Sequence, residues 1–344
     1  MSGARFAELF AELSRPEGVS PELVRRVFDA ILAGEWTPTQ VAGMLVGLRL
    51  RGESAEIIAA AAESLRSAMR SVDHGLDVVL DTCGTGGDGH GTLNLSTGAA
   101  IVAAAAGVPV AKHGNRAVSS RAGSADVLEA LGIALDVPPE AAASVLHEAN
   151  IVFLMAPVYH PAMRHAAVAR RELGIRSIFN CLGPLANPAR ATHQLLGAYD
   201  DQVRTMLART LQALGTRRAW VVRGRDGLDE VSPFGPTKVT EIDGHHLAEI
   251  EIAPEDFGMQ PLEPGSIDGG DPAHNAAVLE KALDGGAHPA ADAFALNAAA
   301  ALVVARGTDP KRALDRAREV LANGAARRTL QSWRSAAAAR RSAE

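Results

Sequence analysis

The sequence has little cysteine and little lysine, and each scarcity is informative. The 344 residues include two cysteines, Cys83 and Cys181, too few for a disulfide framework or for a metal site built from cysteine. The 34 basic residues include only four lysines, Lys112, Lys238, Lys281 and Lys311. Since arginine serves for most cations in this chain, a lysine retained inside a motif indicates a need for a compact ammonium group, which draws attention to Lys112.

Long apolar runs and an excess of positive charge are also missing. No run approaches the roughly 20 apolar residues of a membrane-spanning helix, and the first residues lack the apolar segment of a signal peptide. The net charge of −6 and the pI near 6.0 argue against a nucleic-acid-binding surface. The length allows one large domain or two unequal ones. We therefore expect a soluble cytoplasmic protein that binds neither nucleic acid nor membrane.

The first part of the chain shows helical spacing. Ser20-Pro21 and Thr37-Pro38 each place a capping residue before a proline at the first helical position, and Ser54 begins a third helix. Apolar residues form a stripe along these segments. This pattern predicts a small helical domain over residues 1–72.

From Leu76 onward, short apolar runs alternate with alanine-rich segments, which favours a mostly parallel sheet flanked by helices. We expect residues 76–160 and 181–344 to form this larger α/β domain, with 161–180 packing back on the helical domain. The tail after Trp333 is expected to fray. The predicted strands are Val78–Asp81, Val108–Lys112, Val152–Met155, Trp220–Arg223 and Lys238–Ile242. The predicted helices are Gly98–Ala106, Ser124–Leu131, Pro139–Ala149, Pro161–Leu173, Ala293–Ala305 and Pro310–Leu321.

The most informative segment, Asp81–Gly89, reads Asp-Thr-Cys-Gly-Thr-Gly-Gly-Asp-Gly directly after the first predicted strand. Its glycines allow positive φ and bring backbone N–H groups close to an anion. Asp88 would repel a bare phosphate, so a divalent cation or a ribose hydroxyl should accompany it. Asn94 to Thr97 add donors at a helix N-terminus, although Ser96 alone would also serve as a helix cap. The segment indicates a phosphosugar bound with a metal.

A dinucleotide-binding loop is the first alternative, because Gly84, Gly86 and Gly89 match G-x-G-x-x-G. That motif needs an acidic residue about 20 positions later, on the ribose. The sequence there is Pro109-Val110-Ala111-Lys112, without an acid, and no helix begins directly after the glycines. A nicotinamide cofactor is therefore disfavoured. A tight strand-to-helix turn would explain the glycines but not the polar run behind them.

Two further segments follow predicted strands. Lys112–Asp126 gathers cations, serines and glycines between a strand and a helix, a density of donors that suits a diphosphate. A solvated basic loop is the plain alternative, but ligands of α/β proteins gather beyond the carboxyl ends of strands. Asp226, Asp229 and Glu230 follow another strand. A metal would relieve the repulsion between adjacent carboxylates, and oxygen ligands suit Mg²⁺; a capping turn is the alternative.

Several motifs occur together in the order and spacing of one family. They are Gly84–Asp88, Asn94–Thr97, Lys112–Arg116, Gly123–Asp126, Met155–Pro157, His160–Met163, Arg170–Arg176, Asn180–Leu185 and Asp226–Glu230. On these motifs the chain resembles the anthranilate phosphoribosyltransferases, from the helical N-terminus to about Ala325. Arg121-Ala122, Cys181, Ala186 and His90-Gly91 depart from the usual pattern of the family.

The resemblance implies an enzyme of tryptophan biosynthesis that makes phosphoribosyl anthranilate from anthranilate and phosphoribosyl diphosphate. It implies magnesium, two ions per subunit, and a homodimer formed through the helical domain. Magnesium would be held by Ser96, Asp229 and Glu230, and anthranilate would contact Gly84, Asn115 and Arg170. Phosphoribosyl diphosphate would be surrounded by Gly84, Gly87, Asp88, Thr92, Asn94, Leu95, Ser96, Thr97, Lys112, His113, Gly114, Asn115, Arg116, Ala117, Val118, Ser119, Ser120 and Ser124.

Two rival functions share parts of this pattern. A pyrimidine nucleoside phosphorylase has the same helical and α/β layout and a lysine-bearing phosphate loop, but lacks the Gly-Thr-Gly-Gly-Asp segment with the acidic pair. A non-catalytic, nucleic-acid-binding relative should have a basic surface. No residue stands out as a strong general base, which suits an aromatic amine that is neutral at pH 7. His113 and His160 could shape the acceptor site, but a structural hydrogen-bonding role is the simpler expectation for each.

Overall fold

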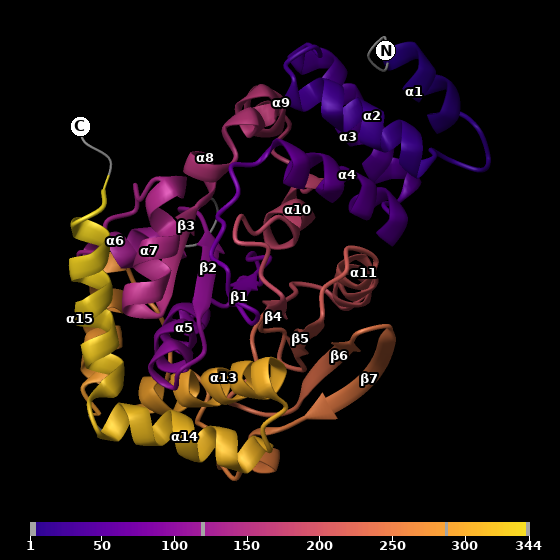
Figure 1. Ribbon diagram of the computed structural model, residues 1–344. Helices are drawn as coiled ribbons and strands as arrows, with labels where there is room; N and C mark the ends of the chain where they lie inside the picture. Colours follow the sequence, from indigo (N-terminus) through magenta and orange to yellow (C-terminus); the bar gives the residue numbers. More distant parts are fainter. Residues whose placement is uncertain (1–4, 118–120, 286–287, 342–344) are drawn as a thin grey trace.

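The computed structural model describes residues 5–117, 121–285 and 288–341. A small helical part stands at one end of a larger α/β part (Figure 1). The small part contains α1 (Phe6–Leu13), α2 (Pro21–Leu32), α3 (Pro38–Arg51) and α4 (Ala55–Ala68). As predicted, Ser20, Thr37 and Ser54 are the N-caps of α2, α3 and α4, and each side chain accepts a hydrogen bond from a first-turn N–H.

The larger part is built on one seven-stranded sheet in the order β3-β2-β1-β4-β5-β6-β7. The pairs from β3 to β5 are parallel, and β6 and β7 add an antiparallel hairpin at one edge. This arrangement confirms the predicted fold class. The strands are β1 (Leu80–Gly84), β2 (Val110–Gly114), β3 (Ile151–Met155), β4 (His193–Gly197), β5 (Arg218–Gly224), β6 (Thr237–Asp243) and β7 (His246–Ile252).

Helices cover both faces of the sheet, and further helices pack around them or against the small part. The helices after α4 are α5 (Leu95–Ala105), α6 (Ser124–Ala130), α7 (Pro139–Ala149), α8 (Ala156–Tyr159), α9 (Arg164–Leu173), α10 (Phe179–Leu185), α11 (Asp201–Ala213), α12 (Pro272–Leu283), α13 (Pro289–Arg306), α14 (Pro310–Ala322) and α15 (Ala325–Ala338). Two short 3₁₀ turns, Pro161–Met163 and Pro254–Phe257, complete the elements.

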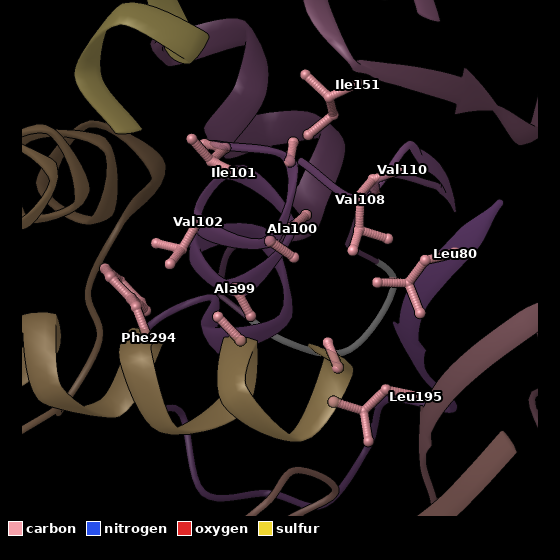
Figure 2. Close-up of a cluster of buried hydrophobic side chains, with 14 of the residues drawn as sticks. Leu80, Ala99, Ala100, Ile101, Val102, Val108, Val110, Ile151, Leu195 and Phe294 are labelled. Carbon is pink, nitrogen blue, oxygen red and sulfur yellow. The ribbon is translucent and has the colours of Figure 1, made fainter. Parts of the chain in front are cut away.

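One face of the sheet packs on α5 and α13 through small residues. Figure 2 shows Ala99, Ala100 and Val102 of α5 between strand residues such as Leu80 and Phe294 of α13. A Cβ on Gly98 would lie 2.4 Å from the Phe294 ring. A glycine is therefore required for the close approach of these two helices.

The opposite face of the sheet shares a core with the helical part. Cys83, Leu196 and Val221 project into a buried cluster that also contains residues of α2, α3, α4, α9, α10 and α11. The Phe28 ring of α2 lies 5.4 Å from the Phe179 ring of α10. The two parts therefore meet through an apolar interface, and α9 lies among the N-terminal helices (Figure 1).

The structure corrects several sequence predictions. Strands β4 and β7 and helices α1, α10, α11 and α12 were not predicted. Strands β1 and β2 begin two residues later than predicted and continue to Gly84 and Gly114, because parallel pairing with β4 and β3 extends to those glycines. The tail after Trp333 does not fray at once: α15 runs to Ala338, with Trp333, Ala336 and Ala337 buried in the main core.

Helix α13 is long and apolar enough to cross a membrane by length and composition alone. Of its 18-residue window, 78% is buried inside the protein, and Ala293 to Val304 belong to the main core apart from the buried polar Asn297. Its hydrophobicity is accounted for by this central position.

Candidate active site

The candidate site lies where parallel strands end. The glycine loop, Thr85–Gly91, follows β1; the Lys112–Ser124 segment runs out of β2; and the turn with Asp226, Asp229 and Glu230 follows β5. Because β2, β1, β4 and β5 are parallel neighbours, their carboxyl ends share one edge of the sheet, where ligands of α/β proteins bind.

The glycine loop has the backbone that its composition predicts. Gly86, Gly87 and Gly89 have φ of 65°, 81° and 83°, in the left-handed region that favours glycine. The Gly86 N–H donates to Oδ2 of Asp229 at 2.9 Å. Oδ1 of Asp88 accepts the His90 N–H at 3.2 Å, and its Oδ2 accepts the Asp229 N–H at 3.4 Å. The loop and the acidic turn are thus in direct contact.

Three carboxylates converge at this contact. Burial raises the pKa of Asp229, and the nearby Asp88 raises it further; burial and Asp229 likewise raise the pKa of Glu230. Asp226 has a different role, because its carboxylate accepts the Leu228 N–H and the Ser232 hydroxyl within the turn itself. The capping-turn interpretation therefore describes Asp226, whereas Asp229 and Glu230 extend toward the glycine loop and α5.

The N-terminus of α5 joins the same site. Oε1 of Glu230 accepts the Ser96 N–H at 3.1 Å. The Lys112 ammonium is buried beneath, where it donates to the Thr82 carbonyl at 2.5 Å and to the Ser96 hydroxyl at 3.1 Å. Burial lowers the pKa of Lys112, and the carboxylates of Asp81 and Glu230 oppose this shift. Lys112 thus places a positive charge directly under the loop and the first turn of α5.

Asp126 closes the Lys112–Ser124 segment, the second loop of the site, on itself. Its carboxylate accepts the N–H groups of Ala117 and Gly123, both at 2.9 Å. The Arg116 guanidinium pairs with Asp126 at 3.1 Å and Glu129 at 2.7 Å. In the structure Arg116 therefore faces two carboxylates, and its role toward a phosphate stays a prediction. Predicted residues Val118, Ser119 and Ser120 lie outside the described residues.

The remaining predicted phosphate-site residues surround the loops. The Asn94 side chain donates to the Ala122 carbonyl and accepts from Asn275, which ties the start of α5 to the second loop. Thr92 forms an isolated antiparallel bridge with Asp268. Gly114 leaves room for Ser124, whose hydroxyl would lie 2.5 Å from a Cβ placed there. The Thr97 hydroxyl is buried without a hydrogen-bond partner among the described residues.

His113 and His160 form a buried pair with ring centroids 5.0 Å apart. Nδ1 of His113 lies 3.0 Å from the Gly183 carbonyl. Its Nε2 has no partner among the described residues, and neither ring nitrogen of His160 forms a hydrogen bond of normal geometry with one. Burial lowers the pKa of His113 to about 3 and that of His160 to about 4. Both imidazoles are therefore neutral at pH 7, and the structural hydrogen-bonding role expected of His160 stays a prediction.

Arg170 and its neighbour Arg171 lie in different environments. Arg171 is exposed, whereas Arg170 is half-buried on α9 with its guanidinium 5.1 Å from the centre of the Phe179 ring. Burial lowers the pKa of Arg170. It forms no ion pair with a carboxylate in the part of the chain that the structure describes.

Sequence reasoning gave no role to Arg176, which lies between α9 and α10. Its guanidinium donates to the Gly87 carbonyl at 2.6 Å and stacks 4.0 Å from the centre of the Tyr199 ring. A Cβ on Gly87 would lie 2.6 Å from this guanidinium. The only available signal was its position inside the Arg170–Arg176 motif.

Two further residues position the acidic turn. A Cβ on Gly197 would lie 1.5 Å from the Asp229 carbonyl, so the end of β4 must be a glycine for the turn to pass. The Asn297 side chain of α13 donates to the Val231 carbonyl and accepts its N–H, at 2.9 and 3.0 Å. These contacts fix the backbone beside Glu230 from two sides.

The donor set suits a cation that brings most of its own ligands. No group of three or more His, Cys, Asp or Glu side chains in the described parts of the chain is arranged to enclose a metal. Asp88 nevertheless lies close enough to raise the pKa of Asp229, and Asp229 and Asp88 both raise the pKa of Glu230. Mg²⁺ binds in this way, through one or two carboxylates with waters and substrate phosphates as its other ligands.

Comparisons with known proteins agree with this architecture. Residues 76–327 match the family model for the a/b domain of a glycosyl transferase family, and residues 7–69 match the model for its helical bundle domain. Anthranilate phosphoribosyltransferase from Moorella thermoacetica is 49% identical over 305 residues, which are 88% of this chain and 90% of that protein.

Solved structures give the same result. The crystal structure of anthranilate phosphoribosyltransferase from Thermus thermophilus has a TM-score of 0.88 and 44% identity, covering 93% of this chain and 96% of that chain. The enzyme from Saccharomyces cerevisiae in complex with PRPP and Mg has a TM-score of 0.90 and 29% identity, and the match covers 98% of this chain and 99% of that chain.

The fold and the strand-end site thus define a transferase of the glycosyl transferase family with a helical bundle and an a/b domain. Within it, the chain belongs to the anthranilate phosphoribosyltransferases. The family expected from the sequence motifs is confirmed, and the relatives do not favour a nucleoside phosphorylase or a non-catalytic nucleic-acid-binding protein.

Proposed function

We propose that this chain transfers the phosphoribosyl group of 5-phospho-α-D-ribose 1-diphosphate to the amine of anthranilate, in the biosynthesis of tryptophan. The observation that carries the proposal is the convergence of the glycine loop, the α5 N-terminus and the acidic turn. Gly86 and Ser96 donate backbone N–H groups to Asp229 and Glu230 at 2.9 and 3.1 Å. N–H donors and cation-binding carboxylates at one point suit a diphosphate that arrives with a metal.

The residues divide between the two substrates. The glycine loop, the start of α5 and the Lys112–Ser124 segment, with the residues predicted from the sequence, bind phosphoribosyl diphosphate. Gly84, Asn115 and Arg170 contact anthranilate. A guanidinium fork suits the carboxylate of that acceptor, and the half-buried Arg170 forms no ion pair with a described carboxylate that would compete for it.

Magnesium is the cofactor, and the resemblance to the family implies two ions per subunit. Asp229, Glu230 and the Ser96 hydroxyl hold it together with the substrate. When bound, magnesium stabilises the negative charge that develops on the leaving diphosphate. Among the chain's own groups, the buried Lys112 ammonium and the N–H groups of the loop act on the same charge.

The reaction breaks the bond between C1 of the ribose and the diphosphate oxygen and forms a bond between C1 and the anthranilate nitrogen. The amine is neutral at pH 7 and supplies the electron pair; the proton it then releases goes to water or diphosphate. Placement of the two substrates contributes much of the rate. The neutral His113 and His160 exclude water near the acceptor without competing for its proton.

The organisation of the chain supports further parts of the proposal. Residues 1–72 with 161–180 form the small domain, and 76–160 with 181–344 form the large one; the shared core of α9 with α2 and α3 supports this division. The protein acts as a cytoplasmic homodimer joined through the helical part, where Phe10 and Leu50 are 61% and 82% exposed. Large apolar side chains this exposed are typical of an interaction surface.

The assay that tests the function follows anthranilate fluorescence. We expect the signal to fall only when phosphoribosyl diphosphate and Mg²⁺ are both present, with release of diphosphate. If the protein instead consumes phosphate together with thymidine or uridine, it is a nucleoside phosphorylase and the proposal is wrong.

A further inference from the structure

A polar cavity lies away from the strand ends, at the junction of the two parts of the molecule. It has a volume of about 320 Å³, and Arg25 and Arg66 of the helical part and Arg190 and Leu214 of the large part contribute to its wall. Arg190 belongs to the connection between α10 and β4, and Leu214 directly follows α11. We call it the arginine pocket.

The Arg66 guanidinium uses only some of its hydrogen-bond donors within the described residues. Its Nε donates to the Leu185 carbonyl at 2.7 Å and its Nη1 to the Leu214 carbonyl at 3.3 Å. These bonds hold the guanidinium plane in place between α4, α10 and α11. Nη2 forms no hydrogen bond with a described residue, so it remains available to a ligand.

Arg190 lines the pocket with a strained backbone. Its φ is 48°, and in the described chain Asn150 is the one other non-glycine residue with positive φ. Asn150 follows α7 as its C-cap, a usual place for this conformation. Arginine has no such preference, so the turn is held by its surroundings: the Arg190 N–H donates to the Asn187 carbonyl, and the buried Asn187 side chain donates to the Ala111 carbonyl at 2.7 Å.

Positive charge in the arginine pocket is not balanced by the protein. Glu63, the acidic residue of the wall, pairs with Arg25 at 2.6 Å. No described carboxylate forms an ion pair with Arg66 or Arg190. Burial and the charge of Arg190 lower the pKa of Arg66 to about 10. Two guanidinium groups that repel each other across a cavity are the arrangement that an oxyanion would stabilise.

We propose that the arginine pocket binds a small phosphate-type dianion, either inorganic phosphate or a phosphate monoester, between Arg66 and Arg190. The bound anion ties α4 of the helical part to the connection that leads into β4. The site is separate from the one that holds the substrates, because none of its residues belongs to the strand-end loops.

Calorimetric titration of the whole protein tests this proposal. The catalytic site is first filled with one equivalent of phosphoribosyl diphosphate in the presence of Mg²⁺ and without anthranilate, so that no excess of this phosphate ester competes for the arginine pocket and the added anion reports on it. Inorganic phosphate and glycerol 3-phosphate are titrated separately, and the tighter binder identifies the source of the anion. The variant is Arg190→Asn, because asparagine tolerates the left-handed backbone while the charge is lost.

We expect the unsubstituted protein to bind at least one of the two probes and Arg190→Asn to bind it roughly tenfold or more weakly, the effect of losing a charged hydrogen bond. Arg312→Asn, which removes an exposed arginine from α14, is the control for net charge and should bind like the unsubstituted protein. No binding of either probe at millimolar concentration, equal affinity in Arg190→Asn, or an equal loss in Arg312→Asn would overturn the proposal.

Discussion

At the scale of single residues, burial rather than residue type decides which groups do chemistry. Lys112 and the His113–His160 pair are all buried, yet the lysine keeps carboxylates nearby that favour its charge, and the histidines do not. The sequence predicted that Lys112 mattered because lysine is scarce. It did not indicate that the two histidines would be neutral partners, since their positions are far apart in the chain.

The lowered pKa of His160 predicts how stability depends on pH. An unfolded histidine has a pKa of about 6.5, and His160 in the folded protein has one of about 4. The unfolded state therefore binds more protons below pH 6.5, so this contribution to stability is complete above that pH and is lost as the pH falls. Between pH 7 and pH 5, His160 lowers the free energy of unfolding by about 2 kcal/mol.

Urea unfolding at the two pH values checks this expectation. Between pH 7 and pH 5, the free energy of unfolding of His160→Gln should fall by about 2 kcal/mol less than that of the unsubstituted protein. Other buried groups, including Asp81 with a pKa raised by burial to about 6, contribute equally to the pH dependence of both proteins, so their contributions cancel in this comparison. The exposed His246 gives the control variant, His246→Gln, which should behave like the unsubstituted protein. Equal losses for His160→Gln and the unsubstituted protein would contradict the burial argument.

At the scale of elements, the connection between α9 and α10 couples the helical part to the glycine loop. Arg176 donates to the Gly87 carbonyl at 2.6 Å. We expect Arg176→Gln to raise KM for phosphoribosyl diphosphate roughly tenfold, as a charged hydrogen bond is worth about 1.5–3 kcal/mol. KM for anthranilate should change little.

Steady-state kinetics with each substrate varied in turn measures this effect. Arg171→Gln is the matched control, because Arg171 is an exposed arginine of neighbouring α9. An unchanged KM for phosphoribosyl diphosphate in Arg176→Gln would show that the contact with the glycine loop does not contribute to substrate binding.

Elements with strong periodicity were predictable, and those shaped by tertiary contacts were not. Strand β4 contains His193 and Gln194, which read as polar, but the Gln194 amide is buried and donates to the Pro184 carbonyl at 2.7 Å. Strand β7 is exposed along most of its length and is fixed by pairing with β6. In both cases a partner from elsewhere in the chain supplies what local hydrophobicity does not.

The site was predictable where a motif follows a strand, and less so where side chains meet across elements. The glycine loop and the acidic turn were found because their composition is unusual. The pairing of Arg116 with Glu129 depends on the closure of the second loop onto α6, which local sequence does not specify. The contact of Arg176 with the glycine loop likewise depends on how α9 and α10 lie relative to the sheet.

At the scale of the whole molecule, the sheet places the candidate active site at its carboxyl edge, and the helical part lies beside it through α9 and α10. The strand-end loops, the α5 N-terminus and the acidic turn come from segments far apart in the sequence, from Gly84 to Glu230. Their convergence matters most for the proposed function, in which phosphoribosyl diphosphate binds to all of them together with magnesium.

Magnesium-dependent binding of phosphoribosyl diphosphate tests that claim most directly. Its affinity is measured by calorimetry over a series of Mg²⁺ concentrations for three proteins: the unsubstituted chain, the double variant Asp229→Asn with Glu230→Gln, and the control Glu263→Gln, an exposed acid. We expect Mg²⁺ to strengthen binding by about tenfold or more in the first and third proteins and to have little effect in the double variant. If Mg²⁺ strengthens binding just as much in the double variant, then Asp229 and Glu230 do not hold the metal that accompanies phosphoribosyl diphosphate.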